Sequence, residues 1–174
     1  QTILMIAAYF GHANFVQHLH NLFGFKIMYQ TINQYDDNHH TALTLAIINN
    51  QMKCVKLLLQ LYKDIINPNQ LDFDGNNMYM IAIINNLHKY IPILYEYFKD
   101  KIDINQVNNF NCSAIILSIW YNSHESIELL YHCFQDKINI NQLTTNKDTP
   151  FMIAAYQGFP ECIIKLNQLY HNDI

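Results

Sequence analysis

A spacing of 36 residues recurs along most of the chain, and this periodicity limits the possible fold more than any other sequence feature. Three kinds of position keep the same register: a polar one, a small one and an asparagine. They are Thr41, Asn77, Ser113 and Thr149; Ala46, Ala82, Ser118 and Ala154; and Asn33, Asn69, Asn105 and Asn141. A fixed period of this length is typical of repeat proteins, in which each unit packs on its neighbours.

An incomplete copy of the same pattern stands at the beginning of the sequence, in residues 2–12. Ala7 precedes Ala46 by 39 residues instead of 36, so we place a short insertion around residues 23–27. The sequence therefore predicts one repeat array over residues 1–174, with units over 1–32, 33–68, 69–104, 105–140 and 141–174.

Each unit contains the patterns of two helices. Apolar residues recur at intervals of three and four over 42–49 and 52–62, and again over 115–121 and 126–134. The polar stretches between units contain Asn, Asp and occasionally Gly, which favour tight turns. A small residue at the Ala46 position lets neighbouring helices touch. We therefore expect an all-α fold of helix-turn-helix units with protruding hairpin loops.

The segment from Thr149 to Phe159 resembles the Thr-Pro-Leu-His-x-Ala-Ala-x-x-Gly-His core of ankyrin repeats, and the first unit matches it as well, ending in Gly11-His12. Residues 55–59 and 127–130 are similar to the second helix of that family. Ile104-Asn105 and Ile140-Asn141 resemble its exit into the next hairpin. The resemblance covers essentially the whole chain and implies an ankyrin-repeat solenoid.

The sequence departs from the family pattern in two ways. The period is 36 instead of about 33, with the extra residues after the second helix, where residues 134–137 replace a Gly-Ala turn; we expect longer second helices. The histidine of the family motif, which links neighbouring repeats by hydrogen bonds, is replaced throughout. Its positions hold Met5, Thr44, Met80, Ile116 and Met152. Apolar packing between repeats should therefore supply more of the stability.

Composition argues against several classes of protein. The net charge is -4, and the ten basic residues are lysines scattered along the chain. Nucleic-acid binding usually requires clustered basic residues, so the sequence does not favour it. Apolar runs are far shorter than the roughly 20 residues that span a bilayer, so we expect no membrane insertion. The four cysteines lie far apart, which favours reduced thiols and a cytoplasmic or nuclear setting. Arg is absent and Asn abundant, as in A/T-rich genomes, so many Asn should replace Gly or Lys.

Residue patterns for catalysis or cofactors are weak. The four glycines are too dispersed for a phosphate loop, and His18 with His20, or His39 with His40, lack the spacing of a metal site. Asp72 and Asp74 fit a turn better than a calcium loop. The cysteines fit packing positions on second helices or in a turn. We therefore expect no enzyme activity, no cofactor and no metal site.

The family resemblance implies that a partner would contact the ends of the first helices and the hairpin tips. The helix-end positions are Tyr9, Phe10, Ile48, Asn49, Ile84, Asn85, Trp120, Tyr121, Tyr156 and Gln157. The hairpin positions include Phe73 and Phe110, together with Asp37, Asn38, His40, Asp74, Asn76, Asn109, Cys112, Thr145, Asn146 and Asp148. Aromatic residues are common at binding hot spots, although aromatics at helical spacing also form cores. We expect an apolar to mildly acidic concave groove centred on Trp120 and Tyr121, binding a helix or extended segment of another protein.

Neither end of the sequence supplies the polar outer face of a terminal repeat, so we expect the chain to be part of a longer array or multidomain protein. A protein-binding scaffold or targeting module is the leading hypothesis. Two alternatives stay open: a substrate-recruiting or regulatory segment of a larger enzyme or channel, and a structural subunit of a large assembly. The sequence favours no particular partner or oligomeric state.

Overall fold

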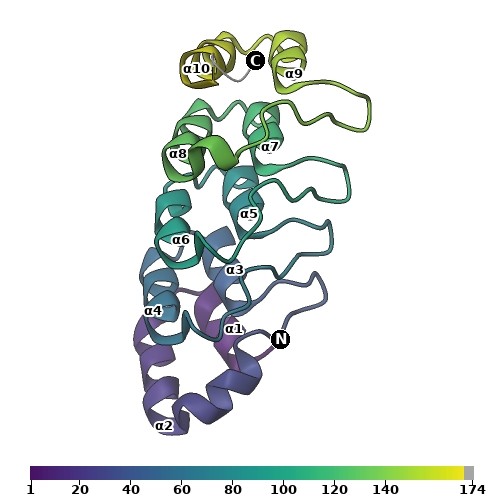
Figure 1. The fold of residues 1–174 in the computed structure, drawn as a ribbon. Helices are drawn as coiled ribbons and strands as arrows, with labels where there is room; N and C mark the ends of the chain where they lie inside the picture. Colours follow the sequence, from purple (N-terminus) through teal and green to yellow (C-terminus); the bar gives the residue numbers. More distant parts are fainter. Residues whose placement is uncertain (171–174) are drawn as a thin grey trace. The chain divides into compact units, whose positions relative to one another are not determined.

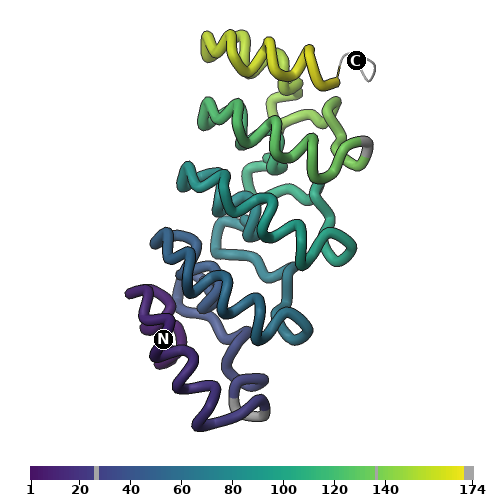
Figure 2. The backbone as a smooth tube through the Cα atoms, turned by 90° about the vertical axis from the view of Figure 1, so that its left-hand side faces the viewer, coloured from purple at the N-terminus to yellow at the C-terminus, as the bar shows by residue number. Residues whose placement is uncertain are grey.

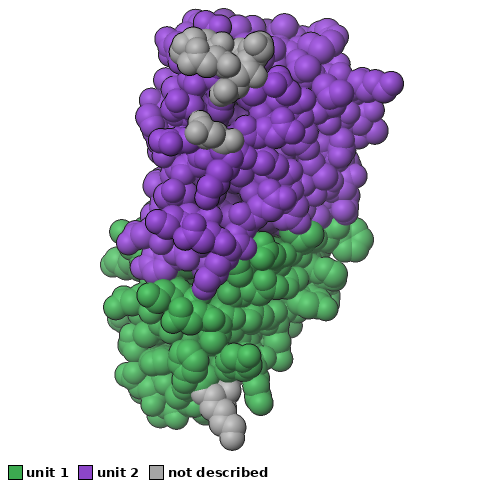
Figure 3. Space-filling view, viewed as in Figure 1, with its two compact units in different colours: residues 1–73 green, residues 74–174 purple. Residues whose placement is uncertain are grey.

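The computed structural model describes residues 1–170, without the side chains of residues 26, 27 and 136. These residues form ten α-helices and one 3-10 helix, with no strand among them. The chain divides into two compact units, Gln1–Phe73 and Asp74–Ile174, coloured separately in Figure 3. Residues 171–174, the end of the last predicted repeat, lie outside the described residues.

Unit 1 consists of two helix pairs, drawn in Figures 1 and 2 from purple to blue. Its elements are α1 (Ile3–Tyr9), α2 (Ala13–Thr31), α3 (Ala42–Ile48) and α4 (Met52–Tyr62). The first helices α1 and α3 pack on each other, as do the second helices α2 and α4. Gly24 interrupts α2 with φ 63° and ψ -176°, so the helix is broken within the stretch where the sequence predicts an insertion.

Unit 2 repeats the same arrangement in three helix pairs and adds a short 3-10 helix. Its elements are α5 (Met78–Ile84), α6 (Tyr90–Phe98), α7 (Ala114–Trp120), α8 (His124–Phe134), η1 (Gln135–Lys137), α9 (Pro150–Gln157) and α10 (Pro160–Tyr170). First helices α5, α7 and α9 contact one another in turn, and so do second helices α6, α8 and α10. In Figure 1 the connecting loops of each unit protrude on the side of the first helices.

The helices follow the predicted patterns to within two residues, which confirms the all-α repeat fold. The second helices α4, α6 and α8 have 11, 9 and 11 residues. The residues that follow α8 form the 3-10 turn η1 instead of continuing the helix. In this repeat the extra residues of the longer period are therefore accommodated by the turn η1 as well as by α8.

The polar position of the repeat serves as the N-cap of each first helix. Thr2, Thr41 and Thr149 accept a hydrogen bond from the amide three residues on, and Asn77 accepts from the amides of Tyr79 and Met80. These caps satisfy amides that the helix itself leaves unpaired. Ser113 is the exception, since its hydroxyl makes no capping bond.

A left-handed backbone conformation ends each first helix, at positions that keep the repeat register. The residues with positive φ are Gly11, Asn50, Asn86, Asn122 and Gly158. Asn tolerates this conformation better than other side chains that carry a Cβ. The expectation that Asn takes the place of Gly is thus met at three of the five turns.

Two of the asparagines that mark the start of a predicted unit, Asn33 and Asn105, link successive repeats. Asn33 donates to the carbonyl of Ile65 at 2.6 Å and accepts from the amide of Asn67 at 2.8 Å. Asn105 makes the same pair of bonds in unit 2, to the Lys137 carbonyl at 2.6 Å and from the Asn139 amide at 2.7 Å. An amide side chain can do both because it carries a donor and an acceptor.

The small position lies where the helices meet, with Ala46, Ala82 and Ala154 fully buried. Ser118 is also buried and satisfies its hydroxyl by donating to the Ala114 carbonyl at 2.8 Å. A larger side chain here would separate the helices or strain the packing.

The two equivalent caps in unit 2 provide a matched test of this account. Asn77→Ala removes two capping bonds from a fully buried site and should lower the free energy of unfolding by about 1–2 kcal/mol. Ser113→Ala should change it by less than about 0.5 kcal/mol, because the buried hydroxyl has no partner among the described residues. Urea denaturation followed by circular dichroism measures both, and equal losses would contradict the assignment of the caps.

Candidate functional site

Exposed aromatic side chains gather at the ends of the first helices in unit 2. Trp120 ends α7, Tyr121 follows it and Tyr156 lies in the last turn of α9; their exposed fractions are 44%, 51% and 72%. The preceding residues of α7, from Ala114 to Ile119, are all buried. The helix therefore stays in the core until its last residue, and its aromatic end reaches the surface.

Trp120 lies near the hairpin that carries Cys112. Burial raises the pKa of the Cys112 thiol, and the Trp120 side chain acts on that pKa in the opposite direction. The Cys112 thiol itself donates to the Phe110 carbonyl at 3.5 Å. The indole ring of Trp120 combines a large apolar face with one polar donor.

The hairpin that carries Cys112 is itself held by hydrogen bonds. The side chain of Asn108 accepts from the amides of Phe110 and Cys112, each at 3.0 Å. The Asn109 amide donates to the Asp74 carbonyl at 2.9 Å, which joins this hairpin to the preceding one. Phe110 projects from the tip with 64% of its surface exposed. The hairpin that carries Phe110 is thus a restrained part of unit 2.

The other predicted contact residues of unit 2 differ in exposure. Asn85 and Gln157 are exposed, whereas Ile84 is half-buried. The Asn85 amide donates to the Ile81 carbonyl at 2.8 Å and so closes its own helix. Cys112 and Asn76, assigned to hairpin surfaces from the sequence, are buried. Their side chains serve the structure of the loops and offer little surface to a partner.

The predicted contact residues of unit 1 also differ in how far they are exposed. Tyr9 and Phe10 are exposed by 43% and 61%, and their rings meet edge to face at 5.0 Å. Phe73 is exposed by 71%. Ile48 and Asn49 are half-buried, and the Asn49 amide donates to the Leu45 carbonyl at 2.9 Å. Asn49 therefore closes its helix in the same way as Asn85.

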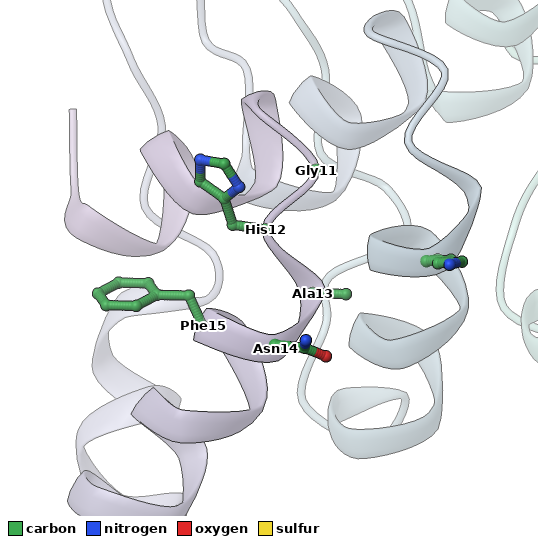
Figure 4. Close-up of a pocket in the computed structure, with 6 residues that line it drawn as sticks. Gly11, His12, Ala13, Asn14 and Phe15 are labelled. Atoms are coloured by element: carbon green, nitrogen blue, oxygen red, sulfur yellow. The ribbon is translucent and has the colours of Figure 1, made fainter.

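Unit 1 also contains cavities that the sequence did not reveal. One of about 440 Å³ lies where α2 begins, and Figure 4 shows the rings of His12, just before α2, and Phe15, in its first turn. Another, of about 230 Å³, is bordered by Tyr9 and Phe10. A third, of about 220 Å³, has an apolar lining that includes Phe23 and Met28. The second of these hollows lies beside the aromatic pair.

Three cysteine thiols and the His20 ring are held in the packed interior or bonded to it. Burial raises the pKa of the thiols of Cys54, Cys133 and Cys162, the last to about 11. His20 shares a hydrogen bond of 3.0 Å with the hydroxyl of buried Tyr62. Among the residues with described side chains, no group of three or more His, Cys, Asp or Glu is arranged to hold a metal ion.

Comparison with known proteins agrees with this architecture. Residues 1–68 match a family model described as ankyrin repeats, in three copies. This match covers the first 68 of the 174 residues, and the helix pairs after residue 68 repeat the same elements in register, which agrees with an all-α array of ankyrin-type repeats. A search of curated proteins gives no match. Within the described part of the chain, none of the helices has the length and apolar character that a membrane crossing requires.

The raised thiol pKa values predict slow alkylation of the folded protein. The thiolate is the reactive form, and with a pKa near 11 about one Cys162 thiol in a thousand is ionised at pH 8. Iodoacetamide at that pH should therefore modify Cys162 far more slowly in the folded protein than in 6 M guanidinium. Peptide mass spectrometry measures each site, and equal rates in both conditions would contradict the burial of this thiol.

Proposed function

We propose that the chain is a protein-binding module that holds its partner on the exposed aromatic surface of unit 2, formed by Trp120, Tyr121 and Tyr156. Ankyrin repeats in general mediate protein–protein interactions. The observation that carries the choice of surface is the exposure of the Trp120 ring at the end of a helix whose preceding residues are all buried. A rigid aromatic side chain with few rotatable bonds loses little conformational entropy on binding.

A helix or an extended segment with apolar anchors suits this surface. Tyrosine and tryptophan rings bury large areas through few rotatable bonds, and their polar groups allow contacts at the edge of an interface. The hairpins of unit 2 contribute the carboxylates of Asp74 and Asp148. The proposed partner segment is therefore mainly apolar, with neutral or basic residues at its edges.

The proposal includes no chemical reaction. Buried thiols with raised pKa values are poor nucleophiles, and binding without catalysis accounts for the residues described. A reduced state of the four thiols also favours the cytoplasm as the place of action. The same surface would serve if the array recruits a substrate for a larger enzyme.

An affinity capture with matched variants tests the proposed surface. The native chain, a Trp120→Ala/Tyr121→Ala variant and an Ile164→Ala variant serve as baits in extract of the native cells. Ile164 is 54% exposed on second helix α10, so its substitution also removes exposed apolar area. We expect the aromatic variant to lose at least 90% of the captured partner, since removal of hot-spot residues costs about 2 kcal/mol or more.

Circular dichroism and the melting temperature establish that each bait is folded. If the Ile164→Ala variant loses the partner and the aromatic variant retains it, the binding surface lies on the second helices and the proposal is wrong.

A further inference from the structure

Three aromatic rings form an exposed cluster on two hairpins of unit 1, apart from the surface proposed above. The rings of Tyr35 and His39 lie 4.6 Å apart, and those of His39 and Phe73 lie 6.3 Å apart in an edge-to-face arrangement. Tyr35 is 54% exposed, Phe73 is 71% exposed, and His39 is exposed as well. Rings that contact one another without being buried leave their faces available to a ligand.

Hydrogen bonds fix the backbone of the two hairpins that carry these rings. The carboxylate of Asp36 accepts from the amides of Asn38 and His40 at 3.0 and 2.8 Å, and the Asp36 amide donates to the His40 carbonyl. The Phe73 amide donates to the Asn38 carbonyl at 3.0 Å and joins the two hairpins. The backbone of the cluster is therefore preorganised, which lowers the entropy cost of binding.

His39 occupies a position of the repeat that has a left-handed backbone in every hairpin described. It has φ 62°, and Gly75, Asn111 and Lys147 have positive φ at the equivalent places in unit 2. Histidine is one of the side chains found more often than most in this conformation. Its ring connects Tyr35 with Phe73 and so completes the cluster.

The two hairpins that carry the cluster contain carboxylates and no lysine. Asp37 is exposed in the hairpin between Tyr35 and His39. Residues 27–52 and 64–73 contain no lysine, and the chain has no arginine. Aromatic faces beside a carboxylate attract a cation, and the planar guanidinium of arginine stacks on such rings more often than the lysine ammonium does.

We infer that the Tyr35–His39–Phe73 cluster, with Asp37, binds an arginine side chain of a partner's extended segment. This site goes beyond the proposed surface of unit 2 and can exist without it. The hairpin tips of unit 1 would then prefer a cationic side chain to a neutral side chain of similar length.

A titration followed by NMR tests the inference on the whole chain. The probes are the peptide acetyl-Gly-Ser-Arg-Ser-Gly-amide and the same peptide with Gln in place of Arg. We expect the Arg peptide to shift the ring resonances of Tyr35 and Phe73, and the Gln peptide to leave them nearly unchanged. Phe73→Leu should weaken binding about two- to fivefold, the effect of one exposed cation–π contact.

Two further variants make the test specific. Asp37→Asn, which leaves the rings intact, should also weaken the binding, whereas Phe110→Leu on a hairpin of unit 2 should not affect it. Equal shifts with both peptides, or full affinity in a Phe73→Leu variant that retains the native spectrum, would overturn the inference. Because the probe is a peptide and the readout lies in unit 1, failure here is distinct from failure of the aromatic surface of unit 2.

Discussion

The left-handed turn that ends each first helix is the constraint on which the rest of the structure depends. It reverses the chain so that the second helix can pack against the first, and it recurs at a fixed place in every described helix pair. Gly11 and Gly158 adopt this left-handed conformation without steric strain, whereas most other residues would be strained in it. Asn50, Asn86 and Asn122 adopt the same conformation because asparagine tolerates it. The chain thus keeps the ankyrin turn with few glycines.

Polar side chains in the loops replace the histidine network that the family motif would supply. The caps at Thr41 and Asn77 close the first helices, and the bridges of Asn33 and Asn105 join one repeat to the next. Apolar packing at the small positions brings the helices together. Because these bonds fix the loops, aromatic rings on helix ends and hairpin tips are exposed on a restrained backbone, and the proposed recognition depends on that exposure.

Much of the fold could be predicted because a 36-residue register repeats the same helix and turn signals four times. The candidate surface was less accessible to sequence reasoning. The sequence placed Trp120 at a helix end, but its exposure depends on the tertiary arrangement. Asn49 and Asn85 were predicted as contacts, yet their amides bond to their own helices. The ring contacts of Tyr35, His39 and Phe73 join residues of different spacing, so no periodicity predicts the cluster. The positive φ of His39 has one signal in the sequence, because the repeat register places Gly75 and Asn111 at the same position.

Site-specific photo-crosslinking tests the central claim most directly, namely that a partner lies against the exposed aromatic end of α7. The chain would carry p-benzoylphenylalanine in place of Trp120, or in place of Ile164 on α10 as the matched position, and would be irradiated in the native cells. The account predicts a discrete crosslinked protein from position 120 and none of that mass from position 164. Crosslinking of that protein from position 164 alone would contradict it.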